Sequence, residues 1–367
     1  MAGKDKTSST QQTDSPRLSR RDALKLTSAA SVPLLAGCTG IGGGGDSSDT
    51  LSVAVWSGTY ADSFKETVKP MYEEETGTTL QVTTGWADLL SKIKSAPEDN
   101  PPFDVTAACC GMYERGVSEG LFQELRLENV PAMDNVYPYL KNFRGHDYGA
   151  PVDGAPAAIM YSDQLGWEPT QWSDLLRDAP LGMDGGFYIF PVSIAALILE
   201  DMPGIEEIYD GDSHEAVFNK LSEMSVDSWY SSGAERWQDI VQGTVNISQS
   251  YFGVSKRKAQ EEDGVSVMMP DRTSAWFGHY CVVRGSEKRD QAENFINFLL
   301  REDVQSPWAQ NSFNLMANQN VQYPDATADA YPQSNEEYQS IKFPDYSYVN
   351  ENSGTLNNKF QQVKQSS

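Results

Sequence analysis

Residues 51–83 read LSVAVWSGTYADSFKETVKPMYEEETGTTLQVT, and this stretch decides the fold class. Residues 51–56 alternate apolar positions and carry β-branched valines, which predicts a strand. A helix is predicted for 60–77 because apolar side chains recur there at helical spacing, at Phe64, Val68, Met71 and Tyr72. Residues 79–83 predict a second strand. The stretch is therefore a strand–helix–strand unit, which is the connection that parallel strands require.

The same alternation continues beyond residue 83. A helix is predicted within 89–94, a strand at 103–108 and a helix at 112–120. A second block follows Ala150, with apolar runs at 157–161 and 186–190, strands at 245–249, 265–269 and 280–283, and helices near 172–177, 194–200, 215–224 and 288–300. The tail from about Val321 is polar and aromatic, with weak periodicity. Strands alternating with helices predict an α/β fold with mostly parallel sheets, covered by helices on both faces.

The composition limits the class of protein. The chain has 367 residues, of which 39% are hydrophobic, and this is enough for two packed domains. Its formal net charge of −24 is spread along the chain rather than gathered in a tail. Nucleic acid is disfavoured as a partner, because it binds a basic face. A dispersed acidic surface keeps a protein soluble in brine, which favours a halophilic source over an ordinary acidic exported protein.

The N-terminal stretch 19–38 reads SRRDALKLTSAASVPLLAGC and predicts export. A basic region, a modest apolar run and small residues before a cleavage site are typical of a secretory signal, and the pair Arg20 and Arg21 marks the twin-arginine kind. Residues 35–38, LAGC, resemble a lipobox, which implies removal of residues 1–37 and lipidation of Cys38. Residues 38–50 then tether the protein flexibly to the outer face of the cytoplasmic membrane. The alternative is an amphipathic helix with an incidental cysteine.

Cysteine and histidine offer little reactive chemistry. After Cys38 the cysteines are Cys109, Cys110 and Cys281, an odd number for an exported chain. Either Cys281 pairs with one of the adjacent two, or all three are buried as small apolar side chains. With three histidines and no metal-binding spacing, the sequence predicts neither a metal nor a cofactor. It also lacks a nucleophile–base motif such as G-x-S-x-G, so an exported enzyme is disfavoured.

Seven landmarks occur in an order that is typical of one family. After an opening strand that ends at Trp56 come ETG at 75–77, FDV at 103–105, SEGLF at 118–122, APV at 150–152, TQWSDL at 170–175 and AENFINFLLRED at 292–303. Together they resemble the extracellular solute-binding proteins (family 1) of ABC importers over nearly all of residues 50–320. The spermidine/putrescine-binding branch is the most similar, with the iron and thiamine binders behind it.

The resemblance implies a two-lobed periplasmic-binding-protein fold of type II, with a hinge and a cleft between the lobes. Lobe 1 is expected to comprise residues 51–152 and 275–320, and lobe 2 residues 153–274 and 321–367. A monomer of this kind captures a small solute and delivers it to a membrane permease that a separate ATPase powers, without catalysis of its own. A sensory receptor with the same fold is the alternative.

The candidate ligand-binding residues follow from the resemblance and from the positions of the strand ends. In the polyamine-binding relatives, the positions that match Trp56, Tyr60, Cys109, Gly111, Tyr251 and Trp276 contact the ligand. The carboxyl ends of strands are also where open α/β sheets bind ligands. Trp229 adds an aromatic ring, Ser231 a polar turn, and Asp153 and Asp271 carboxylates. The alternative for each ring is the core, and for each acid a solvated surface.

A polyamine such as spermidine or putrescine is the ligand that the resemblance favours. Aromatic rings attract an amine by cation–π contact, worth about 0.5–2 kcal/mol each. The set of carboxylates that would bind the ammonium groups is less complete, because the position of the family's aspartate is occupied here by Gly278. If Asp153 and Asp271 do not point inward, a doubly charged amine lacks partners and a singly charged or neutral solute fits better. Thiamine, iron and a neutral compound remain alternatives.

Overall fold

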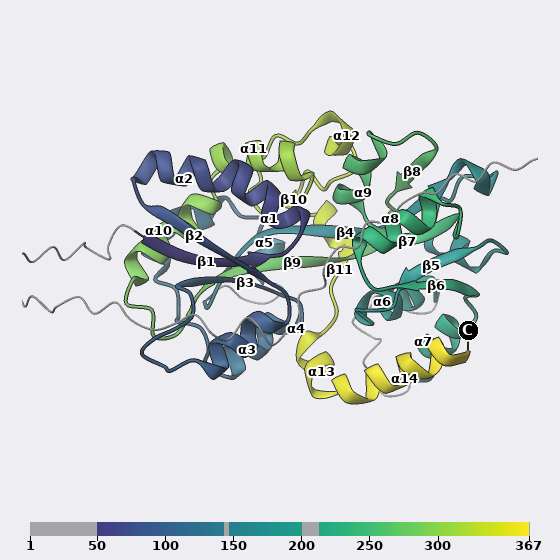
Figure 1. Ribbon diagram of the computed structural model, residues 1–367, viewed down its shortest axis with the longest axis horizontal. Coiled ribbons are helices and arrows are strands. Elements are labelled where there is room, and N and C mark those ends of the chain that lie inside the picture. Colours follow the sequence, from purple (N-terminus) through teal and green to yellow (C-terminus); the bar gives the residue numbers. More distant parts are fainter. Residues whose placement is uncertain (1–49, 143–146, 200–212, 367) are drawn as a thin grey trace, which may run out of the picture. The chain divides into compact units, whose positions relative to one another are not determined.

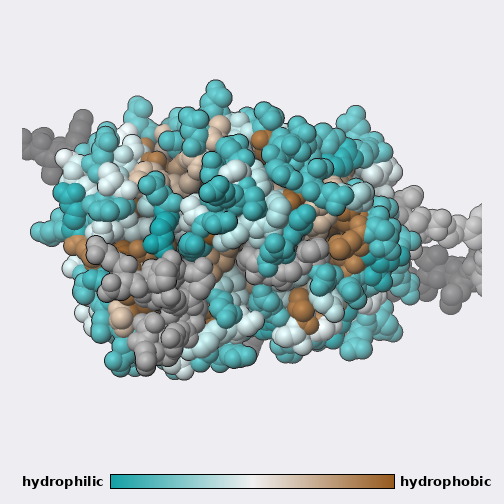
Figure 2. Space-filling model, turned by 180° about the vertical axis from the view of Figure 1, so that it is seen from behind, coloured by the Kyte–Doolittle hydropathy of each residue, from teal (hydrophilic) through white to brown (hydrophobic). Residues whose placement is uncertain are grey.

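The computed structural model describes residues 50–142, 147–199 and 213–366, which belong to one compact unit, Asp46–Ser367. The predicted signal peptide, the lipidated Cys38 and nearly all of the tether lie outside these described residues. Within them, no helix is both apolar enough and long enough to span a bilayer. Hydrophilic side chains cover most of the face shown in Figure 2, as the acidic composition predicts.

The strands form a continuous ladder in the order β2-β1-β3-β9-β4-β7-β5-β6 (Figure 1). Their bounds are β1 Thr50–Trp56, β2 Thr79–Gly85, β3 Val105–Cys109, β4 Ala150–Ser162, β5 Leu181–Asp184, β6 Val226–Tyr230, β7 Ile247–Tyr251 and β9 Thr273–Val282. Three short strands extend it: β8 (Val265–Met268) and β10 (Leu315–Met316) pair with β4, and β11 (Ile341–Lys342) pairs with β9. This is a mixed α/β fold, as the sequence predicts.

Two parallel groups of strands lie at the two ends of the ladder. In the first group β1 runs parallel to β2 and β3, and in the second β5 runs parallel to β6 and β7. The long antiparallel strands β4 and β9 connect the groups. Residues 150–156 of β4 pair with β9, whereas residues 157–162 pair with β7 and β8. Nearly every residue of β4 is buried, so this strand runs through the core of both groups.

The helix predicted for 60–77 is confirmed, although it is not uniform. It comprises α1 (Thr59–Ser63), a π-helical turn η2 (Phe64–Val68) and α2 (Lys69–Thr76), and it ends at Gly77 with a φ of 71°. The other helices of this end are α3 (Asp88–Ser95), α4 (Gly111–Ser118), α5 (Pro138–Asn142), α10 (Arg289–Leu299) and α11 (Glu302–Ser312). In Figure 1, α1, α2 and α11 lie on one side of β1–β3, and α3 and α4 on the other.

The second group of strands is flanked by α6 (Ile189–Ile198), α7 (Ser213–Ser222), α8 (Gly233–Val241) and α9 (Phe252–Ala259). The apolar run at 186–190 is not a strand. Asp184 Oδ1 accepts hydrogen bonds from the backbone N–H groups of Gly186 and Phe187, both at 2.9 Å, and so turns the chain into α6. Because α6 is buried over most of its surface, its apolar sequence lacks the periodicity that distinguishes a helix from a strand.

Short helical turns occupy much of the remaining chain, at η3 (Leu127–Asn129), η4 (Pro131–Asn135), η5 (Asp163–Leu165), η6 (Trp172–Leu176), α12 (Asp325–Ala328) and η8 (Glu337–Ser340). The weakly periodic tail ends in two further helices, α13 (Tyr346–Glu351) and α14 (Ser353–Ser366). Asn350 donates a hydrogen bond to the Gly111 carbonyl at 2.9 Å, and Lys364 donates one to the Gly185 carbonyl at 2.9 Å. The tail therefore contacts both groups of strands.

Replacing Asp345 by alanine should lower the free energy of unfolding by about 1 kcal/mol, the usual value of an N-cap. The Asp345 carboxylate accepts hydrogen bonds from the backbone N–H groups of Ser347 and Tyr348, at 3.0 and 3.2 Å, and so caps α13. Chemical denaturation measures the change. The exposed Glu351 of the same helix provides the control, because Glu351→Ala removes a carboxylate without removing a cap; equal losses from both variants would contradict the prediction.

The register of the ladder decides between the two hypotheses for the cysteines. Cys281 lies opposite Thr106, whereas Cys109 lies opposite Gly278. Three residues of strand separate the two positions by about 10 Å, and a disulfide requires Cα atoms within about 7 Å. Cys110 and Cys281 are buried and Cys109 is half-buried. The hypothesis of a disulfide to Cys281 is therefore wrong, and burial accounts for these side chains.

Candidate functional site

Two tryptophans stack where the first two strands end. Trp56 is the last residue of β1 and pairs with Gly85, so Trp86 follows β2 directly beside it. The ring centroids of Trp56 and Trp86 are 5.7 Å apart, with an interplanar angle of 14°. Trp56 is buried, whereas 58% of Trp86 is exposed. Sequence analysis missed Trp86, although its place directly after a strand is the same signal that singled out Trp56.

Tyr60, in the helix that follows β1, belongs to a buried polar network. Its hydroxyl donates a hydrogen bond to Asp153 Oδ1 at 2.9 Å and lies 2.9 Å from the Tyr280 hydroxyl. Asn314 donates to the other oxygen, Asp153 Oδ2, at 2.8 Å. Asp153 has no exposed surface, and this burial raises the pKa of its carboxyl to about 7, even though the bonds from Tyr60 and Asn314 favour the charged form. Burial also raises the pKa of the Tyr60 and Tyr280 hydroxyls.

The central strands bring three predicted site residues to one face. Residues directly opposite each other in a ladder share a face, as do residues two apart along a strand. Cys109 lies opposite Gly278, and Gly278 opposite Asp153. Two residues along β9, Trp276 lies opposite Ala155 on the same face. The ring of Trp276 is half-buried and meets the edge of Tyr60, with centroids 6.2 Å apart.

The same face continues into the second group of strands. Tyr251, the last residue of β7, lies opposite Ala157, which is two residues beyond Ala155 on β4. Trp276 and Tyr251 are therefore on opposite sides of β4, roughly 12 Å apart, because two strand spacings of about 4.8 Å combine with an offset of two residues of about 3.3 Å each. The pair of alanines between them, Ala155 and Ala157, offers no bulk to fill this space. The Cys110 thiol, which directly follows β3, acts electrostatically on the Tyr251 hydroxyl and adds to the rise in its pKa that burial causes.

A buried arginine lies beside Tyr251. Arg236 is in the first turn of α8, which the Ser232 hydroxyl caps by accepting a hydrogen bond from the Glu235 N–H at 3.1 Å. The Arg236 guanidinium carbon lies 5.6 Å from the centroid of the Tyr251 ring and 5.5 Å from that of Tyr230. The side chain is only 6% exposed. Sequence analysis missed Arg236, because an arginine in an amphipathic helix resembles a surface residue.

Asp184 and Gln249 complete this end of the site. Asp184 is the last residue of β5, and burial raises the pKa of its carboxyl although the N–H groups of Phe187 and Gly186 and the charge of Arg236 favour the ionised form. Gln249 Oε1 accepts a hydrogen bond from the Asp184 N–H at 3.1 Å, and the Gln249 carbonyl accepts one from the Tyr230 hydroxyl at 2.8 Å. The carboxyl ends of β5, β6 and β7 thus gather one cation, one acid, an amide and two tyrosines.

The chain matches the sequence model of one protein family. The model of the bacterial extracellular solute-binding proteins matches residues 67–335, which is most of the chain. The chain belongs to this solute-binding family. The family consists of receptors rather than enzymes, and the members of ABC importers bind a small ligand and work with permease and ATPase components. A comparison with curated protein sequences found no match.

Solved structures resemble this solute-binding protein over their whole length. An ABC transporter protein of Clostridium perfringens is 21% identical with a TM-score of 0.70, over 85% of this chain and 99% of that chain. A spermidine/putrescine-binding protein of Streptococcus pneumoniae is 17% identical with a TM-score of 0.70, over 87% and 99% of the two chains. A GABA receptor is 17% identical with a TM-score of 0.72, over 86% and 97%. At these identities the likeness shows the fold.

Two predicted site residues of the solute-binding protein lie elsewhere, and a third, Ser231, is at the carboxyl end of β6 but exposed. Asp271 is exposed and lies in a bend two residues before β9, five residues before Trp276. Trp229 is one residue before Tyr230 on β6 and points to the other face, where its ring meets Phe360 of α14 at 5.3 Å. Ser231 is exposed, and its N–H and hydroxyl both donate to Glu235 at 2.7 Å.

Gly111 and its neighbour are placed at the strand end as predicted. Gly111 begins α4 directly after β3, and its carbonyl is held by Asn350. Cys110 has a φ of 52°, a conformation that costs a residue other than glycine of the order of 1 kcal/mol and is common at functional sites. No group of three metal-ligating side chains was found in the described ranges of the chain.

Proposed function

We propose that this solute-binding protein is the ligand-binding receptor of an ABC-type importer, and that it captures a small solute between two lobes and delivers it to a membrane permease. One observation carries the proposal: the central strands bring the carboxyl ends of both strand groups to one face, with Cys109 of β3 opposite Gly278 and Tyr251 of β7 opposite Ala157. Ligands of open α/β sheets bind at such strand ends. The solute then lies over Ala155 and Ala157, between the rings of Trp276 and Tyr251.

The two strand groups are proposed as the lobes of a type II fold, with residues 51–152 and 275–320 in lobe 1 and residues 153–274 and 321–367 in lobe 2. The hinge lies in β4 and β9, the long strands that pass from one group to the other. The tail crosses with them, because α13 contacts Gly111 and α14 contacts Gly185. Exported as a monomer, the receptor is held to the outer face of the cytoplasmic membrane by a lipid on Cys38, so that it reaches its permease.

The site offers aromatic rings to the polyamine that the sequence favoured, but few accessible carboxylates. Asp153 is fully buried with a hydrogen bond to each oxygen, and Asp271 lies away from the rings. Leaving one ammonium of a diamine without a partner costs several kcal/mol. Arg236 adds a like charge at the other end of the site. A solute with at most one positive charge therefore fits better than spermidine or putrescine.

Calorimetry on the purified chain in molar sodium chloride tests the receptor function. The panel comprises putrescine, spermidine, thiamine, choline, ferric ion, amino acids, dicarboxylates and simple sugars. Micromolar or tighter binding of one class, with a matching change in tryptophan fluorescence, is the expected result. Failure of every class to bind would contradict the function.

Replacing Trp276 by alanine should weaken binding of that solute about tenfold or more, since one ring contact with a cation is worth up to about 2 kcal/mol. Trp229→Ala provides the matched control. It removes an equal ring from the face of β6 that packs on α14, so the affinity should stay within about twofold of the wild type. Calorimetry measures both variants. Equal losses would place the ligand elsewhere.

A further inference from the structure

Arg236 is a buried cation whose hydrogen-bonding capacity is only partly used, although its side chain makes a hydrogen bond with Tyr230. Its Nε makes no hydrogen bond, and across the described chain no carboxylate oxygen lies within 4.0 Å of the guanidinium. Asp184 acts on it electrostatically from a greater distance, while Asp184 Oδ1 is engaged with two backbone N–H groups. Lys258 adds a second positive charge nearby. A buried guanidinium of this kind is expected to have an anionic partner.

Gln249 offers a second unused donor in the same neighbourhood. It has no exposed surface, and its Nε2 makes no hydrogen bond. The orientation of the amide is fixed, because Oε1 accepts from the Asp184 N–H. Tyr230 contacts both residues, through its ring to Arg236 and through its hydroxyl to the Gln249 carbonyl. Both missing partners are therefore acceptors.

We infer that the solute carries a carboxylate and that Arg236 and Gln249 bind its two oxygens. The inference rests on the proposed receptor function and names the class of its ligand. A carboxylate offers two acceptor oxygens and matches the fork of a guanidinium, whereas the ammonium groups of a polyamine only donate. From Arg236 the solute extends past Tyr251 over the two alanines. Its other end reaches Trp276 and is apolar or carries a single positive charge.

Three solutes of equal chain length separate the charge types: succinate with two carboxylates, 4-aminobutyrate with one carboxylate and one ammonium, and putrescine with two ammoniums. Calorimetry on the full chain in molar sodium chloride is expected to detect binding of succinate, of 4-aminobutyrate or of both. It should detect no binding of putrescine. Arg236→Gln should weaken that binding about 100-fold, because it removes one partner of a buried charged hydrogen bond. Arg177→Gln is the matched control, since it removes the same charge from the Trp167 ring outside the site and should leave the affinity unchanged.

A stability measurement tests the inference without a ligand. Arg236→Met should leave the midpoint of thermal unfolding of the ligand-free protein unchanged or raise it, because a buried guanidinium without a close carboxylate partner destabilises the empty site. A midpoint lowered by several degrees would instead make Arg236 a structural residue and overturn the inference. Two other results would overturn the inference while keeping the receptor function. One is binding of putrescine but of neither succinate nor 4-aminobutyrate, and the other is an unchanged affinity for the solute in Arg236→Gln. Failure to bind any solute of the panel described above would contradict the receptor function itself.

Discussion

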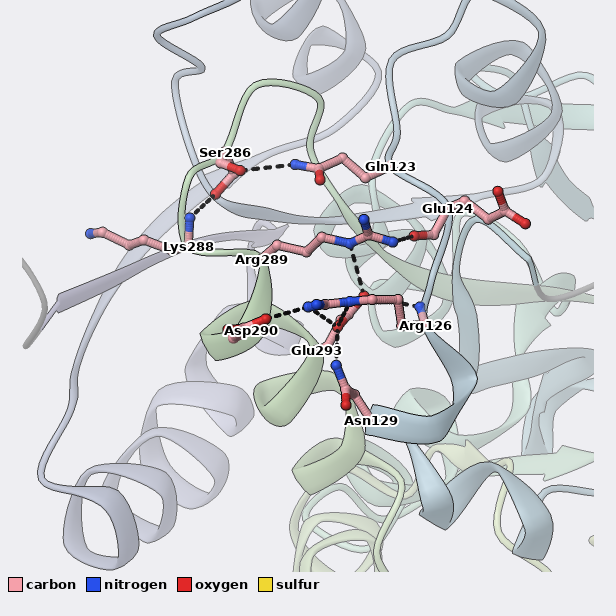
Figure 3. A network of polar contacts seen from close by, with 9 residues as sticks. All are labelled: Gln123, Glu124, Arg126, Asn129, Ser286, Lys288, Arg289, Asp290 and Glu293. Carbon is pink, nitrogen blue, oxygen red and sulfur yellow. Dashed lines mark hydrogen bonds and ion pairs between the residues drawn. The ribbon is translucent and has the colours of Figure 1, made fainter.

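Glu293→Ala is expected to lower the free energy of unfolding by about 3 kcal/mol, because it removes the buried acid of a charged network. Glu293 lies in α10 with no exposed surface. Its carboxylate accepts hydrogen bonds from Arg126 Nε at 2.9 Å, Asn129 Nδ2 at 2.8 Å and Arg289 Nε at 3.1 Å (Figure 3). It also accepts one from the backbone N–H of Arg126 at 3.0 Å. The network fastens the segment after α4 to α10.

Acid should remove the same stabilisation. Burial alone would raise the pKa of the Glu293 carboxyl, but the hydrogen bonds from Arg126, Asn129 and Arg289 outweigh it and hold the pKa below its usual value. The folded pKa is then lower than the unfolded one, so the stabilisation is complete above about pH 4.3 and is lost as the pH falls through the folded pKa. In Glu293→Gln the free energy of unfolding should therefore depend less on pH in this acidic range.

The control for Glu293 is a second acid of the same network. Asp290 accepts a hydrogen bond from Arg126, yet 83% of its side chain is exposed. Exposed ion pairs contribute about 0–1 kcal/mol, so Asp290→Ala should change the free energy of unfolding by less than about 1 kcal/mol. Urea denaturation at pH 7 and constant salt measures both variants. A loss from Asp290→Ala as large as that from Glu293→Ala would contradict the role given to burial.

The fold could be predicted wherever periodicity was strong. The amphipathic helix at 60–77 and the strands on either side of it are present, because their apolar positions follow one period each. The segment 186–190 could not be assigned, since the Asp184 turn and a helix buried on most sides leave no period in the sequence. The tail helices α13 and α14 are held by Asn350 and Lys364, which bond to residues far away in the sequence.

The site could be predicted in part, for a reason that lies in strand geometry. Trp56, Tyr251 and Trp276 could be proposed because strand ends and the crossing strand gather at one place. The face of Trp229 could not be assigned from the sequence, because the side-chain period of a strand is two and a register error of one residue selects the opposite face, here the one that packs on α14. No sequence pattern marks Arg236 as buried, since its burial depends on Tyr230 and Tyr251 from two other elements.

Asp153→Asn is expected to abolish a loss of stability that the wild-type protein suffers as the pH rises towards neutrality. Burial raises the pKa of the Asp153 carboxyl to about 7 in the folded protein. In the unfolded chain an aspartate has a pKa of about 3.9. Between these two values the folded protein keeps a proton that the unfolded chain has lost. The free energy of unfolding therefore falls by about 1.4 kcal/mol per pH unit, to a total of at most about 4 kcal/mol, and becomes constant above the folded pKa.

Asparagine removes the titration and preserves the contacts. Its carbonyl still accepts from the Tyr60 hydroxyl, and the Asn314 amide turns to present its own oxygen to the new NH₂ group. Urea denaturation of both proteins from pH 5 to pH 8 at constant salt isolates the contribution, because every other group titrates alike in the two chains. The difference in free energy should grow with pH in favour of Asp153→Asn and level off near pH 7. A constant difference over this range would show that Asp153 is ionised throughout, and that the Tyr60 and Asn314 hydrogen bonds fully offset its burial.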